Sequence, residues 1–266
     1  KMARHLQSLG GLHTEGDFNA GIDIAEWEQP IRASYRGREV LECGVNGQGV
    51  VALIILRILE GFDMGPEVAL ADRVHLLAEA TKLAYLHRDA LVCDPRFGAD
   101  ATEELLSDRA IDTMRARIDP RRALPPVLWN QPEHKDTIYL CAVDAEGNAI
   151  SFINSIFHAF GSTRLCPETG VLFHSRGMSF SLDLDHPNAI GPGKRPLHTI
   201  IPGMVMEAGR AVMPFGVMGG HYQATGHADF LVGLYDLGLD LQSAMERPRS
   251  FAFDGVLQVE PGMPAE

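Results

Sequence analysis

The first part of the chain, up to about residue 117, places apolar side chains at helical spacing. Apolar residues recur every three or four positions over 50–62 and over a long Ala/Leu-rich stretch at 66–92, which puts them on one face of a helix. A third helix is predicted over 102–118, with Thr102 as a candidate N-cap, acidic residues in the first turn and Pro120 after its end. The pattern therefore predicts that this part of the chain is helical.

Beyond a connecting segment at 121–136, the pattern becomes that of β-structure. The connection has little periodicity and three prolines, which is typical of an exposed, extended segment. Residues 138–143 and 149–156 are apolar or alternating runs around a polar turn, the signal of a β-hairpin. Further elements are expected as strands at 170–173, 200–206 and 211–217, and as helices at about 222–237 and from 241 onward. Helices, then strands, then helices indicate a layered α+β fold.

Composition and charge exclude several classes of protein. The 266 residues are 45% hydrophobic and 22% charged, as in globular proteins, and the net charge of -12 with no Lys/Arg run argues against binding nucleic acid. No CxxC or HExxH spacing occurs, so we expect no metal and no cofactor. The longest apolar run, 50–56, is short of the roughly 20 residues that span a bilayer. A cytoplasmic protein is expected, but Lys1 in place of a starting Met indicates a missing N-terminus, which leaves a periplasmic or secreted protein open.

Five motifs occur in one order along the chain: Asp136-Thr137, the hairpin segment 142–148, Phe160-Gly161-Ser162, Pro192-Gly193-Lys194-Arg195-Pro196 and Met218-Gly219-Gly220. In this order and at this spacing they resemble the γ-glutamyltransferase family of N-terminal-nucleophile hydrolases, from about residue 10 to the last residue. The resemblance implies a precursor that is cut before a threonine, and two subunits that stay associated in an αββα sandwich. This chain would be an incomplete portion of that sandwich.

The resemblance also divides the chain into two parts. Residues 1–136 correspond to the C-terminal part of the large subunit, expected to be mostly helical, and residues 137–266 to the small subunit that starts at the nucleophile. The partner expected from the family is a small-molecule amide substrate, and a homo-oligomer stays open.

Thr137 is the residue on which the implied chemistry depends. A hydroxyl is a weak nucleophile near neutral pH and needs a base within hydrogen-bond reach. A cut between Asp136 and Thr137 would free an α-amine with a pKa near ~8, which can act as that base. Before the cut, the same hydroxyl would attack the Asp136 carbonyl and move the acyl group from nitrogen to oxygen. The alternative interpretation is that Thr137 is simply a β-branched residue at the start of a strand.

Other catalytic positions also follow from the resemblance. Ser155 matches a hydroxyl that hydrogen-bonds the catalytic threonine, and the hairpin would place it near Thr137 across the ladder. Gly219 and Gly220 match the glycine pair whose N–H groups form the oxyanion hole, where the absence of side chains lets the backbone approach the developing charge. An ordinary strand serine and a plain turn are the alternatives.

The expected substrate-binding positions differ from the family pattern. His198 and Thr199 stand where the family commonly has two serines, so His198 either touches substrate or is structural. Arg176 and Ser179 replace the polar residue and the aspartate that hold the substrate's α-amino group, and Phe157 replaces an asparagine. A guanidinium repels an ammonium but binds a carboxylate through two parallel hydrogen bonds. A solvated surface arginine is the alternative for Arg176.

Three functional hypotheses follow. The resemblance implies a self-processing amidohydrolase or acyltransferase that cleaves a small γ-glutamyl amide, as in glutathione hydrolysis, through an acyl-threonine. Arg176 and Ser179 favour an amine-free, carboxylate-bearing amide such as oxamate or a glutaryl amide, as in a subgroup that resembles oxamate amidohydrolase and cephalosporin-type acylases. The third is a processing-deficient relative that serves as a binding or structural module, which Ile138-Tyr139 supports because the family often has Thr-His there.

Overall fold

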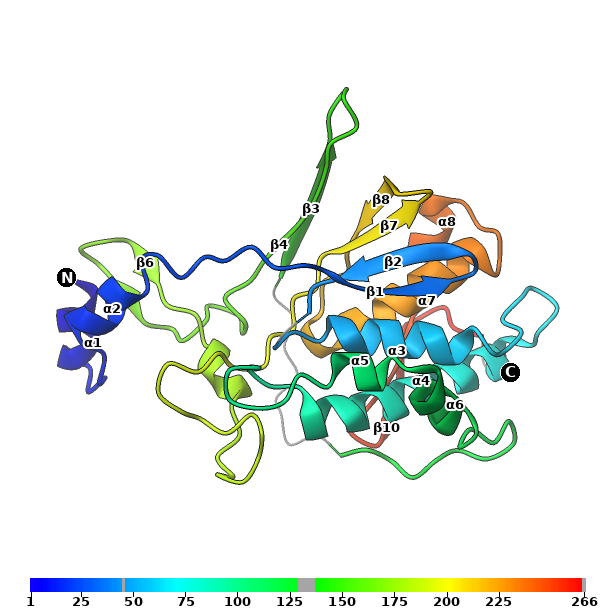
Figure 1. The fold of residues 1–266 in the computed structure, drawn as a ribbon, viewed down its shortest axis with the longest axis horizontal. Helices are drawn as coiled ribbons and strands as arrows, with labels where there is room; N and C mark the ends of the chain where they lie inside the picture. Colours follow the sequence, from blue (N-terminus) through cyan, green and yellow to red (C-terminus); the bar gives the residue numbers. More distant parts are fainter. Residues whose placement is uncertain (45, 129–136, 265–266) are drawn as a thin grey trace.

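The fold is built around a four-stranded antiparallel sheet that is covered on one face by helices. The computed structural model describes residues 1–44, 46–128 and 137–264. The sheet has the strand order β1 (Ile31–Tyr35), β2 (Arg38–Glu42), β7 (Gly203–Glu207) and β8 (Arg210–Phe215). Helix α3 (Gly49–Leu59) packs on β1 and β2, and α4 (Leu70–Leu91) and α7 (Gln223–Tyr235) pack on α3 (Figure 1). This arrangement confirms the predicted α+β class.

The remaining elements are shorter and surround this core. They are α1 (Met2–Ser8), α2 (Glu15–Ala20), α5 (Thr102–Leu105), α6 (Asp108–Arg115), α8 (Leu241–Glu246), β3 (Ile138–Val143), β4 (Ala149–Asn154), β5 (Leu165–Cys166), β6 (Val171–Leu172), β9 (Ser250–Phe253), β10 (Val256–Val259) and two 3₁₀ turns, η1 (Arg176–Ser179) and η2 (Gly220–Tyr222).

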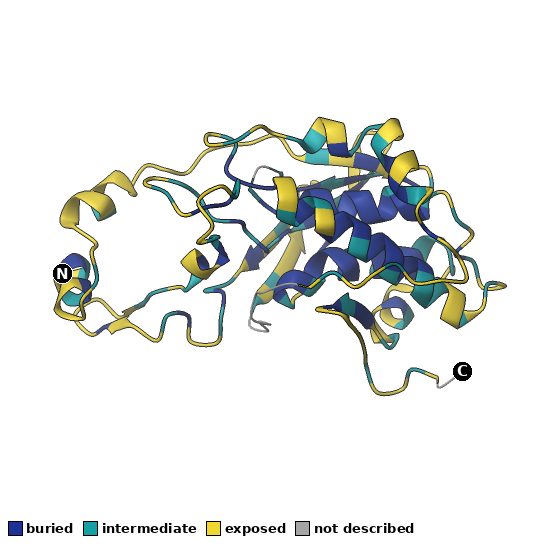
Figure 2. Cartoon of the chain, turned by 90° about the horizontal axis from the view of Figure 1, so that it is seen from below, coloured by how far each residue is buried: buried dark blue, intermediate teal, exposed yellow. Residues whose placement is uncertain are grey.

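Helix α3 forms the centre of the hydrophobic core. Every residue of α3 except Arg57 is buried, and Figure 2 shows the dark colour of buried residues on the central helices, in contrast to α2, which has no buried residue. A helix that is apolar on all sides must be covered on all sides. The sheet and the helices packed on α3 together provide that cover. This packing holds the start of α3, at Gly49, beside the candidate site.

The sheet joins the two parts of the chain that the sequence divides at residue 136. Strand β2 pairs with β7 through Glu39↔Met206, Val40↔Val205 and Leu41↔Met204. Val40 and Val205 are both fully buried. A cut between the two parts would therefore leave them joined by backbone hydrogen bonds and a common core.

The hairpin formed by β3 and β4 projects from this body (Figure 1). About midway along it, the Ser151 hydroxyl donates to the carbonyl of Phe215 at the end of β8, at 3.0 Å. Large apolar side chains along it are exposed, including Ile138 at 68% and Phe152 at 45%. The hairpin lies where the sequence predicts it, with Thr137 immediately before its first strand.

Several local expectations were wrong. The stretch up to residue 117 contains the β1–β2 hairpin as well as helices. The predicted helix over 102–118 is two helices, because Ser107 caps α6 by accepting a hydrogen bond from the N–H of Ala110 at 3.3 Å. Thr102 is not an N-cap: α5 begins after Ala101, which makes no side-chain cap. The β9–β10 hairpin was not predicted.

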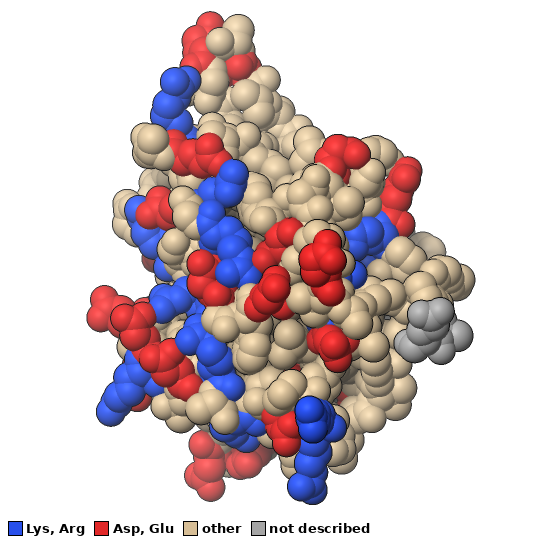
Figure 3. All heavy atoms as spheres, turned by 90° about the vertical axis from the view of Figure 1, so that its right-hand side faces the viewer, with Lys and Arg blue, Asp and Glu red and all other residues tan. Residues whose placement is uncertain are grey.

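The described residues also bear on membrane spans, metal sites and surface charge. No helix among the described residues is both long and apolar enough to cross a membrane. Within the same ranges, no group of three or more His, Cys, Asp or Glu side chains could hold a metal ion. Acidic and basic side chains are intermingled on the face shown in Figure 3.

Candidate active site

The hairpin brings Thr137 and Ser155 to the same end of two paired strands. Ile138 pairs with Asn154 at the base of the ladder, and one more step in this antiparallel register places Thr137 opposite Ser155. The Thr137 Oγ1 atom is buried and makes no hydrogen bond to the described residues. The Ser155 hydroxyl accepts a hydrogen bond from the N–H of Phe157 at 3.0 Å. Asp136, the other side of the expected cut, lies outside the described residues.

Arg176 is the most unusual charged residue of the site. It is 4% exposed, which rules out the solvated surface arginine. One nitrogen, Nη1, donates to the Thr199 hydroxyl at 2.7 Å, and the guanidinium lies 4.4 Å from the centre of the Phe157 ring. The other, Nη2, is buried and has no hydrogen-bond partner among the described residues. Burial, through the loss of hydration, lowers the pKa of Arg176 to about 10.

Two neutral histidines stand beside this guanidinium. The Nδ1 atom of His198 accepts a hydrogen bond from the N–H of Ile200 at 3.3 Å, and that of His174 accepts from the N–H of Arg176 at 3.1 Å. Burial first, and then the charge of Arg176, lowers the pKa of both imidazoles, that of His198 to about 3. Each neutral ring therefore carries its proton on Nε2 and can donate it.

These groups line one cavity. Its volume is about 430 Å³, and it is walled by Glu28, Cys43, Gly44, Asn46, Gly47, Ser155, His174, Arg176, Arg195, Pro196, His198 and Ile200. Of the predicted site residues, Ser155, Arg176 and His198 line it directly. The acidic wall residue Glu28 is paired with Arg195 at 3.2 Å.

The other expected substrate-binding residues lie behind this wall. Thr199 and Phe157 contact Arg176 as described, and Phe157 has a positive φ of 80°, a strained backbone for a bulky residue. Ser179 ends the 3₁₀ turn that Arg176 begins, and side chains three apart in such a turn share a face. Its hydroxyl is buried without a hydrogen-bond partner in the described chain. Ser179 does not line the cavity wall.

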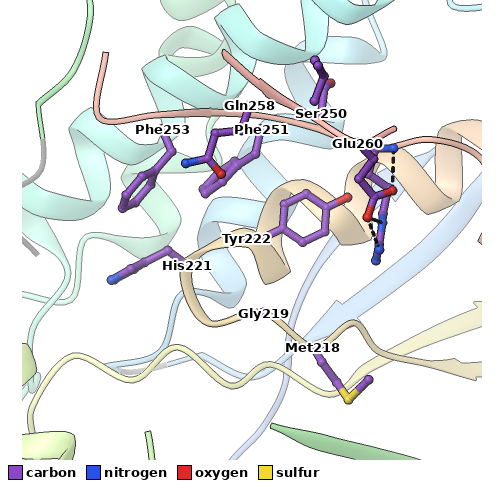
Figure 4. A pocket seen from close by; sticks show the side chains of 11 residues that line it. Met218, Gly219, His221, Tyr222, Ser250, Phe251, Phe253, Gln258 and Glu260 are labelled. Atoms are coloured by element: carbon purple, nitrogen blue, oxygen red, sulfur yellow. Dashed lines mark hydrogen bonds and ion pairs between the residues drawn. The ribbon is translucent and has the colours of Figure 1, made fainter. Parts of the chain in front are cut away.

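The glycine pair forms a tight turn at the head of a helix. Gly219 and Gly220 have φ values of 122° and 57°, a conformation that side chains disfavour. The pair leads into η2 and then α7, where first-turn N–H groups have no intrahelical acceptor and the helix dipole favours negative charge. Gly219 lines a second cavity of about 340 Å³ with Tyr222, Phe251 and the Arg249–Glu260 ion pair (Figure 4).

Two buried polar groups behind this turn were missed by sequence reasoning. Gln48 donates to the carbonyl of Gly220 at 2.8 Å. His227 accepts from the N–H of Val217 at 3.3 Å and contacts Glu42 at 2.6 Å through its other nitrogen. The Gly-rich segment 46–49 leads directly into α3, and nothing local to Glu42 or His227 in the sequence shows that they meet.

Comparison with known proteins identifies the family. The model of the gamma-glutamyltranspeptidase family matches residues 1–266. The chain belongs to this family of N-terminal-nucleophile hydrolases. The resemblance drawn from the five sequence motifs is thereby confirmed.

Relatives whose names give different activities match nearly the whole chain. A glutathione hydrolase-like YwrD proenzyme of Bacillus subtilis is 36% identical over 94% of this chain and 47% of its own length. An oxamate amidohydrolase proenzyme of Klebsiella pneumoniae is 34% identical over 94% of this chain and 46% of its own. A crystal structure of cephalosporin acylase from Bacillus halodurans is 38% identical with a TM-score of 0.90, over 99% of this chain and 48% of that one. The chain thus spans about half the length of the relatives that it matches.

Proposed function

We propose that the protein is a self-processing amidohydrolase that cleaves small amides through an acyl ester on Thr137. The cut between Asp136 and Thr137 would give a large-subunit part, residues 1–136, and a small-subunit part, residues 137–266. Family membership supports this proposal, as do the proenzyme names of both relatives. The shared β2–β7 ladder supports continued association of the two parts.

The proposed mechanism needs only groups of this chain. The freed α-amine of Thr137 takes the proton from Oγ1, which attacks the amide carbon, and the Ser155 hydroxyl orients the nucleophile. The N–H groups of Gly219 and Gly220 stabilise the negative oxygen of the tetrahedral intermediate. The ammonium returns its proton to the leaving amine as the C–N bond breaks. Water or a second amine then attacks the ester and regenerates the threonine.

The buried Nη2 atom of Arg176, which has no hydrogen-bond partner among the described residues, carries the proposal about substrate. A buried cation without a counter-ion is costly, so the site is one that an anion of the substrate completes. We infer that this anion is a carboxylate on the acyl group, held by Arg176 with His198 and His174 as further donors. The described wall of the cavity offers no free carboxylate for an α-ammonium, because Glu28 is paired with Arg195. An oxamate-like or glutaryl-like amide fits this chemistry better than an amide that depends on its α-amino group.

A matched pair of substrates tests this choice. A glutaryl amide and its γ-glutamyl counterpart differ only in the amino group, so their kcat/KM ratio reports directly on that group. We expect the glutaryl amide to be cleaved at least as well. A preference of orders of magnitude for the γ-glutamyl amide would favour glutathione-type hydrolysis and reject the carboxylate-only pocket.

A further inference from the structure

Gln48 is a fully buried amide at the N-cap of α3, and all three of its side-chain hydrogen bonds are made. Its Nε2 group donates to the carbonyl of Thr199 at 2.7 Å and to the carbonyl of Gly220 at 2.8 Å. Its Oε1 atom accepts from Nη1 of Arg88 at 3.1 Å. Because Arg88 can only donate, the amide is held in one orientation with both of its protons committed.

The two carbonyls belong to two separate parts of the proposed active site. Thr199 is the residue whose hydroxyl accepts from Arg176. Gly220 is the second glycine of the turn proposed as the oxyanion hole. Gln48 therefore links the wall that would hold the substrate's carboxylate to the turn that would hold its reacting oxygen.

Further contacts hold both the backbone of Gln48 and the arginine behind its side chain. The N–H of Gln48 donates to the carbonyl of His198 at 3.0 Å, and the N–H of His198 donates to the carbonyl of Asn46 at 2.8 Å. Behind it, Arg88 is 1% exposed, pairs with Asp89 and lies 2.9 Å from Nδ1 of His221. This rigid setting lets a single side chain fix a distance between two backbone segments.

We propose that Gln48 is a positioning residue that sets the separation of the carboxylate pocket and the oxyanion turn. The inference rests on the proposed function. It also assigns a role to the part of the chain before the expected cut, since Gln48 lies before residue 136 and both carbonyls lie after it. A misplacement of about 1 Å at such a site can lower turnover by up to ~100-fold.

Two substitutions separate positioning from stability. Gln48→Met keeps the length of the side chain and loses all three hydrogen bonds. Gln48→Glu keeps the shape and can pair with Arg88, but it presents an acceptor to both carbonyls. Gln242→Met, at an exposed glutamine of α8, is the matched control. We would measure the thermal midpoint, self-cleavage, and kcat and KM on a glutaryl amide and on a pentanoyl amide, which lacks the terminal carboxylate.

We expect both Gln48 variants to lose about 10- to 100-fold in kcat on the glutaryl amide. Their preference for the glutaryl amide over the pentanoyl amide should also fall at least tenfold. Gln48→Glu should be the more stable variant and yet no more active. If kcat and the preference stay within threefold of wild type, or if activity follows the thermal midpoint equally for both substrates, Gln48 is only structural. Should Gln48→Met not fold, Gln48→Glu decides on the same readouts.

Wild-type turnover in the same series tests the proposed function separately. A wild-type enzyme without a carboxylate preference rejects the carboxylate pocket. The Gln48 inference is rejected by the variants themselves, either when they keep the wild-type kcat and preference or when their activity on both substrates only follows the thermal midpoint.

Discussion

Replacing Arg176 by methionine should uncouple activity from stability. Methionine roughly keeps the apolar stem that packs near Phe157 but has no charge. Removing one partner of a buried charged hydrogen-bonded pair costs on the order of 2 to 5 kcal/mol. The lower limit corresponds to at least about 30-fold in kcat/KM for a carboxylate-bearing amide. Self-cleavage should be spared, because Thr137 then attacks a peptide bond of its own chain and needs no bound substrate carboxylate.

The free energy of unfolding should change in the opposite sense or not at all. Burial lowers the pKa of Arg176 from its ordinary value to about 10, so the folded state disfavours the cation by about 3 kcal/mol. The bond to Thr199 and the contact with Phe157 each offset about 1 kcal/mol of this. Methionine should therefore leave the protein as stable as wild type, or about 1 kcal/mol more stable.

The assay combines kinetics with chemical denaturation and a binding measurement. Glutarate should raise the thermal midpoint of the wild-type protein and not that of Arg176→Met, and Arg164→Ala, at an exposed arginine, should match wild type in both assays. A variant that unfolds several kcal/mol more easily and loses activity equally on charged and uncharged acyl amides would refute the reasoning.

Two further predictions concern the oxyanion turn and the neutral histidine. Gly220→Val should lower kcat by about 100-fold or more, because a side chain there would obstruct the turn and move a backbone N–H donor out of place. Gly209→Val, at φ 76° in an open turn, carries similar strain and should keep the wild-type kcat. A self-cleaved, fully active Gly220→Val would contradict the assignment. His198 is neutral in the folded protein with a pKa of about 3 but protonates near 6.5 when unfolded, so its contribution to stability is lost as the pH falls from 6.5 towards 3. From pH 7 to 5 this loss is up to about 2 kcal/mol, and denaturant titrations should show a correspondingly flatter pH dependence for His198→Gln; an unchanged slope would mean that His198 is charged in the folded state.

Periodicity located the main elements because it is a local property. The long helices α3 and α4, the β3–β4 hairpin and α7 all lie within a few residues of their predicted places. The β1–β2 hairpin, which turns at Arg36 and Gly37 with positive φ values, was missed. The β9–β10 hairpin was also missed, although the Asp254-Gly255 pair at its turn is a strong hairpin signal in the sequence. Short strands in these places gain their stability from pairing and packing with distant segments, which periodicity cannot show.

The candidate site divides in the same way. Motif order assigned roles to Thr137, Ser155 and the glycine pair, which stay predictions, because each sits on an element whose local signal is clear. The burial of Arg176 depends on how residues 173–180 pack on Phe157 and Thr199, and its sequence alone left a surface arginine open. The contacts of Gln48 join residues more than 150 positions apart, so only the fold shows them.

The central claim is that Thr137 becomes the N-terminal nucleophile, and trapping the acyl-enzyme tests it most directly. The protein would be mixed with a slowly hydrolysed glutaryl amide, quenched in acid and analysed by intact and peptide mass spectrometry. We predict a fragment that begins Thr-Ile-Tyr-Leu and carries one glutaryl group on Thr137, with neither cut nor adduct in Thr137→Ala and some of both in Thr137→Ser. An active preparation that stays at precursor mass, or an adduct on another residue, would contradict the account.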